Sequence, residues 1–185
     1  MAMHFPDLND EVRAVMLEEI RFDLERDKLH MSNRLSLAGQ EIWPRLLAHA
    51  AENGTPQSLA SELRKNGRML ASEMSHRNGK PYPKAVPRNA PETLAEGEFN
   101  RFYIRAICAI ALRRDQADVE VYRAKDVINP RPESVSKIGS RVDAEALLND
   151  LRTSIGVESA LGIPAGPNSG LSVCLLPITA PFSVT

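Results

Sequence analysis

The chain has 185 residues, of which 43% are hydrophobic and 25% are charged. These proportions are close to the averages for soluble globular domains, and they exclude a collagen-like, coiled-coil or wholly disordered chain. The formal net charge is −1, so bulk charge does not make the whole molecule a polyanion binder. A chain of this length predicts one compact domain, or one domain with an appendage.

The sequence contains no pattern that indicates a metal, a cofactor or a membrane. Cys108 and Cys174 lie in separate apolar runs, and the four histidines are scattered without the spacing of metal ligands. The N-terminus lacks the basic and apolar regions of a signal peptide. The longest apolar run, 106–112, is far shorter than the roughly 20 residues of a membrane span. We expect a cytoplasmic protein without a cofactor or a membrane partner.

Apolar residues at helical spacing predict a first helix over about 7–29, with a charged outer face. Pro44 is expected at the first position of a second helix, because proline inside a helix costs about 3 kcal/mol. That helix should end at Asn53–Gly54, a common left-handed stop. Thr55 followed by Pro56 predicts the start of a third helix.

The third helix is expected to reach about Met74, because the sequence Leu59–Leu63 is echoed eleven residues later by Leu70–Met74. Asn66–Gly67 lies between the two copies and could end the helix earlier. Residues 75–91 contain four prolines and Asn78–Gly79, and we expect a long loop there.

A long apolar helix is expected to follow this loop and to form the centre of the fold. Asn89, with Glu92 three residues later, has the spacing of a capping box, which predicts the helix start. The apolar pattern continues to about Arg114.

The C-terminal part changes character. Residues 119–122 alternate and include β-branched side chains, which predicts a strand. Asp143 predicts the start of a helix that Gly156 would stop. A loop over 162–170 and a second strand over 171–176 should follow.

The predicted fold class is therefore mainly α with a small α+β C-terminal part, a helical body of four to five helices plus two or more short strands. We expect the body to span 1–114, with the basic loop at 75–91. The α+β part would span 115–176 and pack on the body, and 177–185 would form an extended tail.

Positive charge is concentrated between residues 64 and 90, which contain seven bases and a single acid, Glu73. A local basic region attracts phosphates even when the whole protein is nearly neutral. The lead hypothesis is a non-enzymatic protein that binds nucleic acid or another polyanion through this segment. The expected phosphate contacts are Arg64, Lys65, Arg68, Arg77, Lys80, Lys84 and Arg88. The competing interpretation is a solvated loop, or a loop docked on the acidic first helix at Asp23 and Asp27.

The second and third predicted helices have the scale of a helix-turn-helix motif, which would imply DNA binding. Residues that read DNA usually lie at the start of the recognition helix, where this sequence has Gln57, Ser58 and Ser61. Its bases lie toward the far end. Any pair of helices joined by a short loop gives the same pattern, so the motif by itself is weak.

A polar stripe on the core helix contains Glu98, Arg101 and Arg105. Two arginines one turn apart could clamp an anion or extend the basic surface, although such residues more often form ion pairs that cover a core. Ser134 and Lys137 have S-x-x-K spacing without a K-T-G partner, and 162–170 matches no phosphate-binding loop.

Two further hypotheses stay open beside the lead. One is a protein-interaction or assembly module that uses the N-terminal helix or the proline-rich tail. The other is an enzyme with a site near Glu98, Arg101 and Arg105, which we expect less than binding because no catalytic motif is complete.

Overall fold

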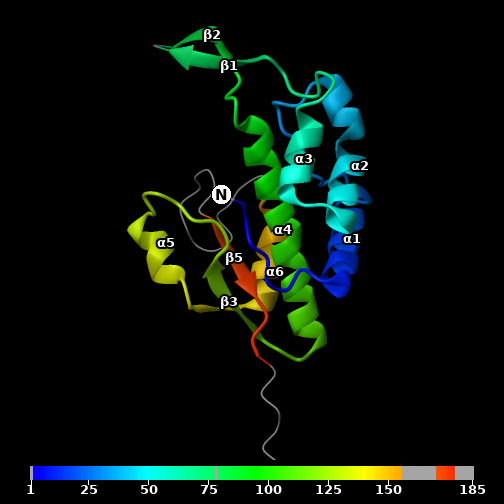
Figure 1. Ribbon diagram of the computed structural model, residues 1–185, viewed down its shortest axis with the longest axis vertical. Helices are drawn as coiled ribbons and strands as arrows, with labels where there is room; N and C mark the ends of the chain where they lie inside the picture. Colours follow the sequence, from blue (N-terminus) through cyan, green and yellow to red (C-terminus); the bar gives the residue numbers. More distant parts are fainter. Residues whose placement is uncertain (1, 78, 156–169, 178–185) are drawn as a thin grey trace, which may run out of the picture.

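A computed structural model describes residues 2–77, 79–155 and 170–177 of the chain. These residues form six helices and five short strands in two small sheets, which confirms the predicted fold class (Figure 1). The elements in chain order are α1 (Asp10–Leu24), α2 (Leu37–Asn53), α3 (Pro56–Leu63), β1 (Ser72–Arg77), β2 (Lys80–Ala85), α4 (Ala90–Arg113), β3 (Asp118–Arg123), α5 (Pro132–Lys137), β4 (Arg141–Asp143), α6 (Ala144–Thr153) and β5 (Leu171–Cys174).

Helix α4 runs through the middle of the molecule, as its apolar sequence predicted (Figure 1). Phe99, Phe102 and Ile107 are fully buried in it. Helices α1, α3 and α6 pack against α4, and so do strands β3 and β5. One hydrophobic core therefore includes both the helical body and the C-terminal part, since Val121 of β3 and Leu148 of α6 belong to it.

Helix α1 is shorter than the predicted helix over 7–29. It begins after Asn9, whose side chain accepts a hydrogen bond from the backbone N–H of Val12 at 3.0 Å. Beyond Leu24 the chain turns, and Asp27 adopts a left-handed φ of 53°. Asn and Asp tolerate such positions because their short polar side chains bond locally.

The predicted helix start at Pro44 is wrong, because Pro44 lies inside α2. The helix begins after Ser36, which accepts a hydrogen bond from the N–H of Gly39 at 3.1 Å. Trp43 and Leu47 are buried on both sides of the proline, and the Trp43 indole donates to the carbonyl of His30 at 3.0 Å. Packing of this continuous face offsets the cost of a proline in the helix.

Thr55 is the N-cap of α3, as predicted, and forms a capping box with Ser58. The continuation to Met74 is wrong, because α3 ends at Leu63. Asn66 and Gly67 both have positive φ, 53° and 64°, which turns the chain away from the helix. The first copy of the echoed sequence, 59–63, is helical, whereas the second copy, 70–74, is not helical and its last three residues begin β1.

The prediction of a loop over 75–91 is also wrong. Strand β1 ends inside this range, β2 lies wholly within it, and the two strands form a β-hairpin. Strands β1 and β2 are antiparallel, with Arg77 opposite Lys80 at the turn and Ser72 opposite Ala85 at the other end. The turn sequence is Asn78–Gly79, and Gly79 has a φ of 75°. Asn-Gly is the residue pair that tight two-residue hairpins favour.

The C-terminal predictions hold where the structure describes them. Strands β3 and β5 match the predicted strands, and they lie in one antiparallel sheet in the order β4-β3-β5. Asp143 caps α6 by accepting from the N–H of Ala146 at 2.7 Å. The predicted helix stop at Gly156, the loop over 162–170 and the tail over 177–185 lie wholly or mostly outside the described residues.

The capping box predicted at the start of α4 does not form. Asn89 is the N-cap residue, but its side chain makes no capping hydrogen bond, and Glu92 pairs with Arg64 instead. Among the described residues, no helix has both the length and the apolar character needed to cross a membrane.

Candidate nucleic-acid interface

The hairpin of residues 72–85, which we call the basic arm, projects from the end of the helical body (Figure 1). Twelve residues make up its two strands, and only Glu73 and Ser75 are partly buried. In the described chain these strands pair with each other and with no third strand. The arm is thus an exposed ribbon without a core of its own.

The two faces of the arm differ in chemistry, because alternate residues of a strand point to opposite sides. One face pairs Glu73 with Lys84, Ser75 with Tyr82, and Arg77 with Lys80. We call it the polar face. The other face pairs Met74 with Pro83 and His76 with Pro81 and is largely apolar. The arm therefore collects its three bases on one side.

The base of the arm is tied to the segment before α2. Ser36 donates its backbone N–H to the carbonyl of Arg68 at 2.9 Å, and Leu70 donates to the carbonyl of Arg34 at 2.8 Å. Gly39 lies so close that a Cβ on it would be 2.0 Å from the carbonyl oxygen of Arg68. Only glycine permits this approach, so the sequence fixes where the arm leaves the body.

Arg34 neutralises the carboxylate of the arm. Its Nε and Nη2 donate to the two oxygens of Glu73 at 2.7 and 3.0 Å, a bidentate pair. The hydrogen bond from Arg34 lowers the pKa of Glu73, with a smaller electrostatic contribution from Lys84. Glu73 is therefore ionised and matched by Arg34, which leaves the charges of Arg77 and Lys80 uncompensated.

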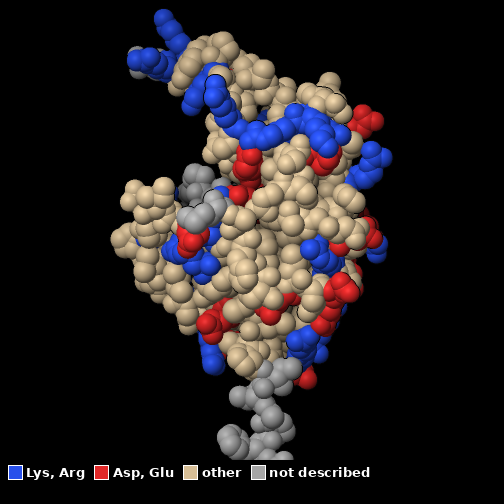
Figure 2. Space-filling view, in the orientation of Figure 1, with Lys and Arg blue, Asp and Glu red and all other residues tan. Residues whose placement is uncertain are grey.

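The seven predicted contact residues fall into two groups. Arg64 pairs with Glu92, while Lys65 and Arg68 both pair with Glu62. The second group is exposed and forms no ion pair within the described residues: Arg77, Lys80, Lys84 and Arg88. Figure 2 shows Lys and Arg side chains along the arm and onto the adjoining end of the body. The segment that contains all seven thus lies at one end of the molecule, and four of the seven are exposed and form no ion pair within the described residues (Figure 1).

Arg101 and Arg105 do not extend this basic surface, because both are buried. Arg105 is fully enclosed, and its guanidinium contacts Glu19 at 2.7 Å and Asp23 at 2.6 Å. It clamps anions, as its spacing suggested, but they are carboxylates of its own chain. Arg101 donates to the carbonyls of Leu151 and Ser154 and lies 3.6 Å from Glu98.

The buried cluster around Arg105 also includes Arg152, which contacts Glu19 at 2.5 Å. Burial raises the pKa of Glu19, but the hydrogen bonds and charges of Arg152 and Arg105 outweigh it, and the net shift is downward. Because Asp23 is bound to Arg105 and the arm projects away from α1 (Figure 1), the interpretation that docks the basic segment on Asp23 and Asp27 is wrong.

Helix α3, the recognition helix of the predicted helix-turn-helix, is eight residues long, about two turns. Leu59 and Leu63 are buried, whereas Gln57 and Ser61 are exposed. The bases predicted at its far end lie at or after its C-cap, Arg64. They lie at the C-cap of α3 and in the connection to β1, and not on the face of a recognition helix.

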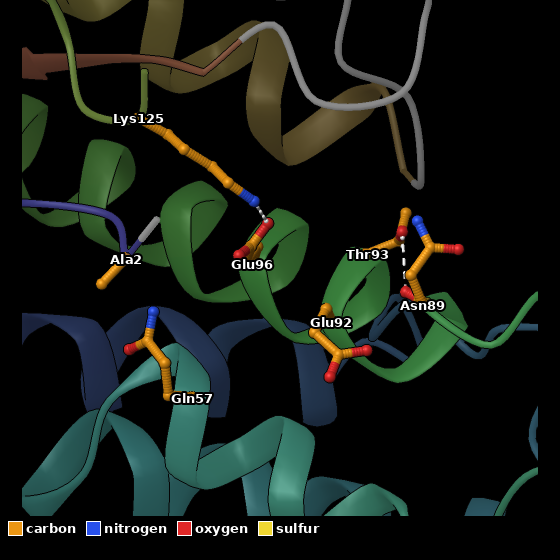
Figure 3. Close-up of a pocket in the computed structure, with 7 residues that line it drawn as sticks. All are labelled: Ala2, Gln57, Asn89, Glu92, Thr93, Glu96 and Lys125. Carbon is orange, nitrogen blue, oxygen red and sulfur yellow. Dashed lines mark hydrogen bonds and ion pairs between the residues drawn. The ribbon is translucent and has the colours of Figure 1, made fainter. Parts of the chain in front are cut away.

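A pocket of about 420 Å³ lies where α3 and the start of α4 meet the chain after β3 (Figure 3). Its lining residues are Ala2, Gln57, Asn89, Glu92, Thr93, Glu96 and Lys125. Glu96 is paired with Lys125 at 2.5 Å, and Glu92 is paired with Arg64. Each carboxylate thus has a base from another element, although the second oxygen of Glu92 is buried without a hydrogen-bond partner in the described chain. No three His, Cys, Asp or Glu residues of the described chain are grouped as a metal site.

The N-terminal helix has no free apolar stripe for a protein partner, since Val12, Met16 and Ile20 are buried against the body. The other proposed docking segment, the tail, lies mostly outside the described residues. The chain matches no protein-family model, no curated protein and no solved structure. The arrangement of its own residues is therefore the basis for a functional proposal.

Sequence reasoning missed Arg34 and Gly39, which set the charge and the position of the arm. Neither residue has a local pattern that links it to 68–73, because the contacts span more than 28 residues of chain. The hairpin itself did have a signal. Asn78–Gly79 lies between two extended segments, which is the strongest short-range indication of a hairpin.

Proposed function

We propose that this protein binds nucleic acid through the basic arm. The observation that carries the proposal is an exposed hairpin whose bases are not paired within the described chain, while its single carboxylate is neutralised by Arg34. Arg77, Lys80 and Lys84 would contact phosphates from the arm, and Arg88 from its base. This set is narrower than the seven residues of the basic segment.

The physical support is the release of counter-ions from the nucleic acid. A DNA duplex carries a condensed shell of cations, and exposed basic side chains that neutralise its phosphates release these cations, which favours binding. A two-stranded hairpin without a core is only marginally stable, so it contributes little to the stability of the fold. A ligand-contacting role accounts for such an arm better than a packing role does.

The bases before the arm support the same function less strongly. Arg64, Lys65 and Arg68 are held by Glu62 and Glu92, so a phosphate must compete with an existing ion pair. The ion pairs of Arg64 and Lys65 are exposed and contribute only about 0–1 kcal/mol, so competition is feasible there. The side chain of Arg68 is only 11% exposed and also donates to the backbone carbonyl of Glu62, so it is the least accessible of the three. We expect these three residues to add less to affinity than the four free ones.

The experiment is a salt titration of binding to a fluorescent DNA duplex, followed by anisotropy. Four phosphate contacts at about 0.9 each predict a slope of log affinity against log salt near −3.6. The variant Lys80→Ala/Lys84→Ala should reduce the magnitude of this slope by about 2 and weaken all sequences alike.

The matched control is Lys28→Ala/Arg45→Ala, which removes two exposed positive charges from the helical body and none from the arm. Its slope should stay close to that of the unaltered protein. Absence of binding at about 50 mM salt, or an equal loss of slope in the control, would reject the proposal.

A further inference from the structure

The basic arm has the size and exposure of a free two-stranded ribbon. Each strand has six residues, which at about 3.3 Å per residue makes the ribbon about 20 Å long. Paired strands lie about 5 Å apart, and sheet faces with their side chains occupy about 10 Å. Within the described residues no other strand covers either edge.

These dimensions match one groove of one nucleic-acid form. The major groove of B-form DNA is about 12 Å wide and about 8.5 Å deep and admits a two-stranded ribbon, whereas the minor groove is only about 6 Å wide. An A-form RNA duplex has a deep and narrow major groove that side chains do not reach. The shape of the arm thus favours B-form DNA over duplex RNA.

The polar face has the chemistry that the floor and the walls of this groove require. Arg77 and Lys80 lie opposite each other at the tip, and Lys84 lies on the same face nearer the body. In this placement Arg77 contacts a base in place of a phosphate, because an arginine at the tip can donate two hydrogen bonds to O6 and N7 of guanine. Lys80, Lys84 and Arg88 keep their phosphate contacts, so at about 0.9 per contact the salt slope on a G·C-rich duplex falls to about −2.7. The lysines can reach the phosphates that line the groove.

The prolines of the arm argue against a protein strand as its partner on one edge. Arg77 and Lys80 flank a two-residue turn and form a hydrogen-bonded pair, so the backbone of residues 81 and 83 faces away from β1. Both positions are proline and lack an N–H. The outer edge of β2 therefore cannot form a regular ladder with another strand.

The aromatic content of the arm argues against single-stranded nucleic acid. Tyr82 is the only Phe, Tyr or Trp between residues 70 and 90. Proteins that bind single strands stack successive bases on several aromatic side chains. One tyrosine provides one such platform.

We infer that the ligand of the basic arm is double-stranded B-form DNA, with the tip of the hairpin and the exposed β2 side of its polar face in the major groove. This inference rests on the proposed function and specifies its ligand. Arg88, just after β2, would then meet a phosphate at the rim of the groove.

The test compares binding of the full chain to probes of one sequence: a DNA duplex, each of its single strands, and the matching RNA duplex. A second DNA duplex carries glucosylated 5-hydroxymethylcytosine, whose sugar fills the major groove, and netropsin is added to occupy the minor groove. We expect the plain DNA duplex to bind at least about tenfold tighter than the single strands, the RNA duplex and the glucosylated duplex. Netropsin should change the affinity by less than about twofold.

Two variants test the placement of the tip. Arg77→Lys keeps the charge but removes the planar fork, so it should weaken binding to a G·C-rich duplex more than to an A·T-rich one. Arg77→Ala should weaken binding to both. Equal effects of Arg77→Lys on the two duplexes would overturn the contact between the tip and the bases.

The possible outcomes separate the two claims. If no probe binds, nucleic-acid binding itself fails. If single strands or duplex RNA bind as tightly as duplex DNA, the arm still binds nucleic acid, but the inferred ligand is wrong. If the glucosylated duplex binds as tightly as the plain one, or netropsin abolishes binding, the major-groove placement is wrong.

Discussion

The cluster around Arg105 and the basic arm both contain basic side chains, but the two regions differ in how the positive charge is balanced. Arg105 is fully enclosed, and its charge is matched by Glu19 and Asp23 through short hydrogen bonds. Lys80 and Lys84 are exposed on a ribbon, and the only carboxylate beside them is already matched by Arg34. In the first region positive charge is paired inside the protein, and in the second it is exposed to solvent.

The difference shows what decides the role of a base in this chain. Arg105 lies on α4 among the apolar residues of the core. A buried charge is unfavourable unless it is paired, so the carboxylates of Glu19 and Asp23 are buried beside it. The arm has no core, and water solvates its basic side chains, so they need no ion pair within the protein. Variants of the two regions should therefore separate stability from binding.

The largest expected effect is that of Arg105→Met, which leaves two buried carboxylates without their shared base. Removal of one partner from a buried ion pair costs about 3–5 kcal/mol. Equilibrium unfolding in urea measures this loss. Arg113→Met, which breaks the exposed pair with Glu18, is the control and should cost about 0–1 kcal/mol. A change below 1 kcal/mol in Arg105→Met would show that the cluster does not stabilise the fold.

Acid should weaken the same cluster. The pKa of Glu19 is lowered in the folded protein, so its stabilising contribution is complete above the ordinary glutamate value of 4.5. The contribution is lost as pH falls through the lowered pKa of the folded state. The free energy of unfolding should therefore decline on acidification, and Glu19→Gln should reduce that decline. An unchanged pH profile in Glu19→Gln would assign the acid sensitivity to another group.

Gly39→Ala should affect both the helical body and the arm, because Gly39 of α2 packs against the segment that leads into the arm. The new methyl group would meet the backbone carbonyl of Arg68, which cannot move as freely as a side chain. Overpacking of this kind costs about 1–3 kcal/mol. Unfolding measures the cost, and the DNA affinity should also change, because the base of the arm has to shift. Ala38→Gly, one residue earlier, is the control for altered helix propensity.

The smallest effect expected on the body is that of Thr55→Ala. It removes the side chain that caps α3 and should cost about 1 kcal/mol. The salt slope of DNA binding should not change, since Thr55 contributes no charge. A loss of DNA affinity in this variant would place α3 in the binding site and would support DNA binding through the helix-turn-helix.

The parts of the fold that sequence predicted are those with a local physical cause. Thr55 and Asp143 were identified as caps because a cap needs only its own first turn, and α4 was identified from its apolar length. Pro44 misled because tertiary packing of Trp43 outweighs a local penalty. The prolines of 75–91 favour a loop over a strand in the sequence, but strands at the edge of a sheet tolerate proline, so the hairpin forms in spite of them.

The candidate site was predictable in composition but not in arrangement. The seven bases of residues 64–90 could be listed from the sequence, and all of them lie at one end of the molecule. Their division into free and paired groups depends on Glu62 and Glu92, and the neutralised arm depends on Arg34. Burial of Arg105 depends on α1, whose acids are more than 80 residues away in sequence.

The central claim is that the arm binds DNA while the rest of the chain folds without it. Removal of the arm tests this claim most directly. Val86 donates its N–H to the carbonyl of Ala71 at 3.0 Å, so the two ends are close enough to be joined by Gly-Gly in place of residues 72–85. The shortened protein should unfold within about 1–2 kcal/mol of the full chain, because it loses one partly buried ion pair, that of Arg34 with Glu73, and no buried apolar side chain. It should also lose binding to the DNA duplex at about 50 mM salt. A folded, armless protein that still binds the duplex with full affinity would contradict the account.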